Sequence, residues 1–177
     1  MRIDLRKGVI LVVVGLCAAI GPAPAHTSDA VIAGDQAGPI ELGETRISDL
    51  KEWFGEPTAS KVVSVQCIKA TRMRWGRRLV VIVPRYKGRN QRVGQATVWK
   101  RTIESSRDGD LTMHTTKGLR VGDSEEKLND LYPNRKGETH RGHTHYFLGY
   151  GENDGVLWVR VEDGSVVNLQ VGPYEFC

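Results

Sequence analysis

Hydrophobic positions recur with helical spacing in a stretch near the middle of the chain, residues 115–134. Leu128, Leu131 and Tyr132 follow the i, i+3, i+4 spacing that places side chains on one face of a helix, and Ser124 is suited to cap its start. A helix of about nine residues is too short to persist alone in water, because nucleation is unfavourable and few bonds follow it. We therefore expect a sheet to cover the apolar side of this helix.

An earlier stretch, residues 40–57, has the same organisation. Ile47, Leu50 and Phe54 form an apolar stripe, with Thr45 as the expected cap, and a Gly-Glu-Pro sequence ends the pattern. The two stretches share a glycine before the helix, a hydroxyl cap and a proline after it. This organisation predicts an internal repeat, with a chance similarity between two amphipathic helices as the alternative.

After each helix the pattern changes to the alternation of β-strands. The expected strands are 60–68, 70–75, 79–83, 95–102, 144–150, 156–162 and 165–171, with shorter ones at 111–114 and 119–121. Alternation places Arg72 and Arg74 on one face of their strand and Met73 and Trp75 on the other. An Asp163-Gly164 pair predicts a hairpin between the last two strands.

These elements predict an α+β fold of two tandem units, each a short helix, or a helical hairpin, packed on an antiparallel meander sheet. The expected organisation is a signal peptide at 1–25, a disordered leader at 26–39, a first unit at 40–103, a connector at 104–117 and a second unit at 118–177. Together the two units would form one compact domain.

The first 25 residues have the features of a secretory signal peptide: three cations, the apolar run Val9–Ile20, and small residues at Ala23 and Ala25 for cleavage. Twelve apolar residues are fewer than the roughly twenty that span a bilayer. The predicted location is therefore secreted or cell-envelope, without a membrane span after cleavage. Cleavage removes three cations and one acid, which lowers the formal charge from +4 to +2.

Two cysteines, Cys67 and Cys177, remain after cleavage. An even pair in an exported chain predicts one disulfide, with free thiols or an intermolecular bridge as alternatives. Closing a loop of about 110 residues would contribute about 4–5 kcal/mol by constraining the unfolded chain.

The charge distribution is uneven, since residues 58–103 contain twelve Lys and Arg but no Asp or Glu. Aromatic residues are interleaved with these cations, and Trp158 shares a strand face with Arg160 and Glu162. Binding candidates are the tryptophans and the arginines of the predicted sheet faces, namely Trp75, Trp99, Trp158, Arg72, Arg74 and Arg160. Export excludes nucleic acid as the expected partner and favours a protein or an anionic envelope polymer.

The sequence Leu119-x-Val121-Gly122-Asp123-Ser124-x-x-x-Leu128-x-x-Leu131-Tyr132-Pro133, with the Gly55-Glu56-Pro57 helix end and two sheet segments, resembles two groups of proteins. These are the tandem-repeat proteins of the beta-lactamase inhibitory protein type and the small outer-membrane lipoproteins of the SmpA/OmlA (BamE) type. The resemblance implies a helix packed on an antiparallel sheet, twice, and a protein-binding role. It carries over no contact residue, and the inhibitor type closes a disulfide within each repeat, which these two cysteines cannot do.

Three histidines lie close together at His140, His143 and His145. On a strand, His143 and His145 project to the same side and could bind a transition metal ion, with His140 or Glu138 as a third ligand. The alternative is a polar edge strand with solvated histidines.

The sequence contains no G-x-S-x-G, H-E-x-x-H or glycine-rich phosphate-binding motif. We therefore expect a non-enzymatic, cofactor-free, secreted protein-binding module, which could inhibit an enzyme. The alternatives are a structural envelope protein that binds anionic cell-wall polymer through its basic sheet, and a metal-binding secreted protein.

Overall fold

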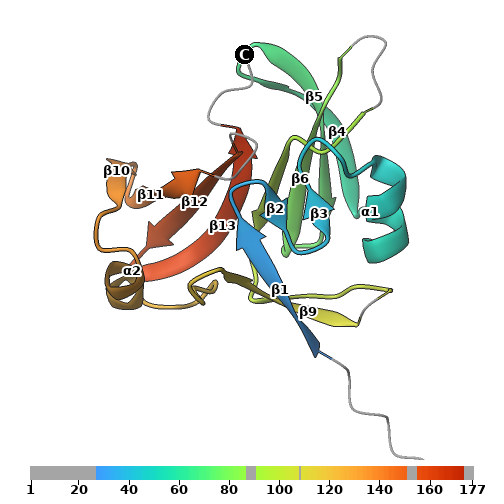
Figure 1. Ribbon diagram of the computed structural model, residues 1–177. Helices are drawn as coiled ribbons and strands as arrows, with labels where there is room; N and C mark the ends of the chain where they lie inside the picture. Colours follow the sequence, from blue (N-terminus) through green and yellow to red (C-terminus); the bar gives the residue numbers. More distant parts are fainter. Residues whose placement is uncertain (1–26, 87–90, 108, 151–154, 174–177) are drawn as a thin grey trace, which may run out of the picture.

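The computed structural model describes residues 27–86, 91–107, 109–150 and 155–173, and the predicted signal peptide lies outside them. This part of the chain forms two helices and thirteen strands, and the strands make up two sheets (Figure 1). The helices are α1 (Ile47–Phe54) and α2 (Glu125–Leu131). The strands are β1 (Thr27–Ala33), β2 (Gln36–Ala37), β3 (Ile40–Glu41), β4 (Ala59–Val65), β5 (Ile68–Trp75), β6 (Leu79–Pro84), β7 (Gln95–Val98), β8 (Thr102–Ile103), β9 (Asp110–Thr115), β10 (Lys136–His140), β11 (His143–Tyr150), β12 (Gly155–Glu162) and β13 (Ser165–Pro173).

The larger sheet has eight strands in the order β10-β11-β12-β13-β7-β6-β5-β4, and every neighbouring pair is antiparallel. In chain order, α1 precedes four of these strands and α2 precedes the other four. The two meanders join where β13 pairs with β7, with Gln170 opposite Thr97. The structure confirms the α+β class, whereas the tandem repeat remains a prediction.

The smaller sheet has the order β3-β2-β1-β9-β8, and its β1 and β9 pair in parallel from Thr27 opposite Asp110 to Ile32 opposite Thr115. This pairing corrects the predicted disordered leader at 26–39, because β1 is a strand in which Ala30 and Ile32 are buried. The partner strand lies about eighty residues away in the chain, so a local pattern could not indicate it. The short strand expected at 111–114, within the predicted connector, is confirmed as β9.

Both helices and the smaller sheet pack against one face of the larger sheet. Leu50 of α1, Leu128 of α2 and Ile32 of β1 are fully buried in one cluster with Val159 of β12. In Figure 1, α1 lies beside the β4–β6 half and α2 beside the β10–β13 half. The two apolar stripes that the sequence predicted therefore share a single core.

A close backbone approach joins the two sheets. A Cβ atom built on Gly155, the first residue of β12, would overlap the carbonyl oxygen of Gly34 in the β1–β2 turn. Glycine at this position allows the turn to lie against the larger sheet, because any residue with a Cβ atom would clash with the turn.

The helix starts follow local hydrogen bonding. Ser124 caps α2 by accepting a hydrogen bond from the Lys127 amide at 3.2 Å, as the sequence predicted. The predicted cap of α1 is wrong: Arg46 is the cap residue, and its amide donates to Asp49. Thr45 is buried instead and accepts from the Glu41 amide, which fixes the turn before the helix.

Several strand predictions are confirmed, including the β12–β13 hairpin, where Asp163 and Gly164 have φ of 47° and 70°. Positive φ values at both central residues are typical of the two-residue hairpin turn whose twist matches that of the flanking strands. The strand expected at 119–121 is not formed, and β10 was missed because its five residues are all exposed and lack an apolar face. No helix within the described ranges is long and apolar enough to cross a membrane.

Candidate binding surface

The face of the larger sheet opposite the helices, here called the outer face, carries most of the candidate residues. Directly paired residues in an antiparallel sheet point to the same side, so a row can be followed across it. One such row on the outer face runs from Lys136 through Phe147, Trp158, Gln170, Thr97 and Val80 to Arg74. Neither helix nor the smaller sheet packs on this side among the described residues.

The outer face is strongly concave. A single cavity of about 330 Å³ is lined both by Val65, at the end of edge strand β4, and by Glu138, on the opposite edge strand β10. In a flat sheet, seven spacings of about 4.8 Å would place these edges roughly 34 Å apart. The sheet must therefore curl until its two edge strands approach one another across the outer face.

Arg160 is the centre of an aromatic and cationic cluster on this face. Its guanidinium lies 5.9 Å from the Trp99 ring centroid, 3.3 Å from His143 Nδ1, and in an ion pair with Glu162. Trp158, on the same strand, packs against Phe147 with ring centroids 5.5 Å apart. The structure thus brings together Trp99, Trp158 and Arg160, three of the six binding residues predicted from the sequence.

Arg72 and Arg74 lie on the same outer face but on β5, in the other half of the sheet. Arg72 is paired with Lys61 of β4, and Arg74 is exposed. Lys61, Arg72 and Arg74, here called the basic strip, form no ion pair with an acid among the described residues. The strip makes this edge of the concave face electropositive.

Trp75 does not belong to this surface. It is 8% exposed, its indole nitrogen donates to the Gly55 carbonyl at 2.9 Å, and its ring packs edge-on against Phe54 with centroids 6.1 Å apart. The alternation of residues along the sequence already places Trp75 on the same strand face as Met73, which is the core face. Its burial removes Trp75 from the binding candidates and makes it a residue that supports the fold.

The histidines lie together on the outer face, with ring centroids 6.2 Å apart for His140 and His143 and 5.0 Å apart for His143 and His145. No group of three His, Cys, Asp or Glu side chains among the described residues is arranged to hold a metal ion. The nearby Arg160 guanidinium also opposes a second cation beside His143. The metal site at His143 and His145 remains a prediction without support from this geometry.

His145 gives the outer face a pH dependence. Burial lowers the pKa of His145, and the neighbouring His143 and Arg160 lower it further. The unfolded chain then binds a proton at its ordinary pKa near 6.5, whereas the folded chain binds it only at lower pH, so stability present at pH 7 is lost as the pH falls. We expect the urea midpoint to decrease between about pH 7 and pH 5, and His145→Gln to reduce that decrease; an identical pH profile in the variant would contradict this.

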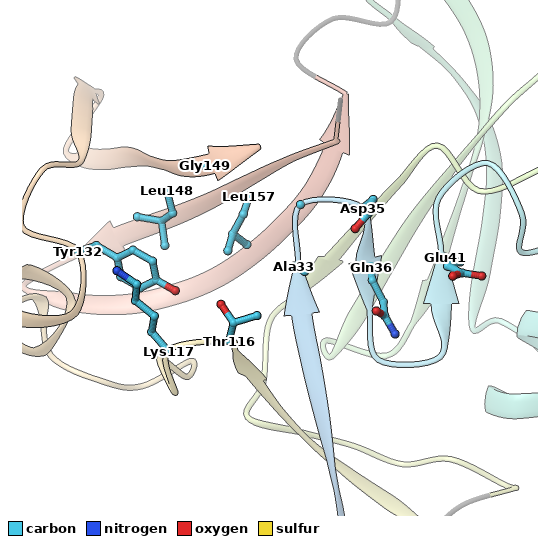
Figure 2. Close-up of a pocket in the computed structure, with 11 residues that line it drawn as sticks. Ala33, Asp35, Gln36, Glu41, Thr116, Lys117, Tyr132, Leu148, Gly149 and Leu157 are labelled. Carbon is cyan, nitrogen blue, oxygen red and sulfur yellow. The ribbon is translucent and has the colours of Figure 1, made fainter. Parts of the chain in front are cut away.

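A larger cavity of about 720 Å³ lies on the opposite, helix-covered side of the sheet, between the end of β1 and strands β11 and β12 (Figure 2). Its floor includes Leu148 and Leu157, and the Lys117 ammonium lies 4.7 Å from the Tyr132 ring centroid while donating to the Leu131 carbonyl at 3.0 Å. The Lys117 ammonium is therefore already engaged by the Tyr132 ring and the Leu131 carbonyl. The cavity presents no nucleophile beside a base and none of the predicted binding residues.

The predicted disulfide joins Cys67 to Cys177. Cys67 lies in the turn between β4 and β5, and Cys177 lies outside the described residues. The pairing therefore remains a prediction from the sequence.

No protein-family model and no curated protein match the chain. Among solved structures, the chain is similar to a "putative beta-lactamase inhibitor protein" from Streptococcus mutans, with 15% identity and a TM-score of 0.27 over 84% of this chain and 92% of that one. A TM-score this low establishes neither a common fold nor a common activity.

Proposed function

We propose that this chain is an exported, non-enzymatic protein-binding module whose docking surface is the concave outer face of the eight-stranded sheet. The observation that carries this proposal is the concentration of Trp99, Phe147, Trp158 and Arg160 on a curved face that neither helix covers. Tryptophan and arginine are enriched among the few desolvated residues that supply most of the binding free energy at protein interfaces.

The charge of the outer face indicates an acidic partner surface. Its basic strip, Lys61, Arg72 and Arg74, lies at one edge, and Arg160 lies nearer the other. Toward the other edge, Glu162 pairs with Arg160, and Glu138 lies on the same strand face as Lys136, so the largest excess of positive charge is on the strip. Such a distribution accelerates encounter with negative surfaces and selects against positive ones. The finer proposal, that the partner is an enzyme which this module inhibits, follows the family resemblance of the sequence.

The test is affinity capture from the culture supernatant and envelope extract of the producing cells, with the mature chain as bait. A specific partner should be retained by the wild-type chain and reduced by about 30-fold in affinity by Trp158→Ala, as expected for an interface hot spot. Lys51→Ala is the matched control, because Lys51 lies on helix α1 and forms only an exposed pair with Glu56. Equal capture by Trp158→Ala, with its fold intact by circular dichroism, would contradict docking at the outer face.

The basic strip also favours a second candidate function, retention on anionic cell-wall polymer. In that case, binding of the wild-type chain to purified polymer decreases steeply as the salt concentration rises. The Arg72→Gln/Arg74→Gln double variant loses most of this binding, whereas Trp158→Ala keeps it. Binding that is unchanged by salt would remove this candidate.

A further inference from the structure

We propose that the cavity of about 330 Å³ on the outer face binds a neutral saccharide, with the sugar ring against Trp158 and its hydroxyls hydrogen-bonded by Gln95, Gln170 and His145. This inference goes beyond the protein-docking role, because it assigns a small-molecule site to a part of the concave face. The volume is at the small end of the range of roughly 300–1,000 Å³ typical of small-molecule sites, which suits a sugar unit rather than a larger cofactor.

The lining disfavours anionic and strongly apolar ligands. Its residues come from both edges and the centre of the sheet, namely Val65, Gln66, Gln95, Glu138, His140, His145, Trp158, Gln170 and Pro173. None of these described lining residues is Lys or Arg, and Glu138 contributes a carboxylate, so an anionic ligand would be repelled. The polar lining is too extensive for a lipid chain, because its amides and imidazoles would be left without hydrogen bonds.

Two side-chain hydrogen bonds, one within β7 and one from β7 to β13, hold the amides of Gln95 and Gln170 in place. Gln95 Nε2 donates to Thr97 Oγ1 at 3.4 Å, and the Thr97 hydroxyl donates to Gln170 Oε1 at 3.3 Å. Thr97 is buried, so this relay is sheltered from water. It uses the nitrogen of one amide and the oxygen of the other, which leaves the Gln95 oxygen as an acceptor and the Gln170 nitrogen as a donor for a ligand.

A ligand that both donates and accepts hydrogen bonds matches this pair. A sugar hydroxyl does both with one atom, and neighbouring hydroxyls on a ring repeat the pattern. His145 adds a further group of the same kind, since a neutral imidazole has one donor and one acceptor nitrogen.

Trp158 supplies the apolar wall that a saccharide ring requires. It is half-buried, and Phe147 supports it from the neighbouring strand. An indole offers a large flat apolar surface with little conformational freedom to lose, which suits the C–H face of a sugar ring. A wall of this kind beside fixed donors and acceptors distinguishes the cavity from an ordinary solvated sheet face.

The experiment is an array of neutral mono- to tetrasaccharides probed with the full mature chain, followed by calorimetric titration of the best ligand. We expect binding of at least one neutral saccharide. Trp158→Ala and Gln170→Glu should each weaken it about tenfold or more, because the second leaves the Thr97 bond intact but removes the donor. Asn129→Asp, the same amide-to-acid change at an exposed position of α2 on the other side of the sheet, is the matched control and should change the affinity less than about twofold.

Failure of the folded wild-type chain to bind any neutral saccharide would overturn this inference. Saccharide binding that both variants retain would also overturn it. Since the array contains no protein partner, its result is independent of the docking proposal.

Discussion

Replacement of Trp75 by alanine should lower the free energy of unfolding by about 3–5 kcal/mol, the range for removing a large aromatic from a core. Trp75 is buried against Phe54 at the end of α1, and its indole donates to the Gly55 carbonyl. The variant loses the packing and leaves a carbonyl without its partner. Against a total stability of roughly 5–15 kcal/mol, such a loss is expected to reduce the urea midpoint severely.

The matched control is Arg74→Thr, one residue earlier in the same strand. Arg74 is exposed on the outer face, and threonine is a good strand former, so the change should stay within about 0.5 kcal/mol. If Trp75→Ala were as mild as Arg74→Thr, Trp75 would have to lie on the open face, and the orientation of the whole sheet would be wrong.

Leu128→Ala should lower the free energy of unfolding by about 2–5 kcal/mol, since it opens a cavity where α2 meets the larger sheet. Leu128 is fully buried, and it is the residue of the seven-residue helix that is most completely covered. A helix of this length depends on tertiary packing rather than on its own hydrogen bonds. The adjacent Tyr132, whose hydroxyl donates to Thr115 Oγ1 at 2.8 Å, should become more accessible as the helix loosens.

Thermal and urea unfolding of Leu128→Ala and of Asn129→Ala measure this effect. Asn129 is exposed on the same helix, and alanine has the higher helix propensity, so this control should be neutral or slightly stabilising. Hydrogen exchange of the α2 amides would show whether the loss is local or global. Equal stabilities for the two variants would refute the role of the apolar stripe.

The candidate site was predictable in part. Five of the six predicted binding residues, Trp99, Trp158, Arg72, Arg74 and Arg160, lie on or reach the outer face. Alternation along each strand contains this information, because side chains two residues apart share a face. The cavity and its glutamines were missed, since Gln95 and Gln170 are ordinary polar residues in separate strands and become a pair only through the β7–β13 register.

By itself, the sequence determined the local elements: the Ser124 cap, the stripe of α2, the alternation of β12 and the Asp163-Gly164 hairpin. Each depends on residues within a few positions of one another, where propensity and periodicity act directly. The tertiary structure alone decided the parallel pairing of β1 with β9, the junction of the two meanders, and the curl that brings both edge strands to one cavity. These features depend on contacts between segments that are distant in the chain. Which distant segments pair is decided by the packing of the whole core and not by any local pattern.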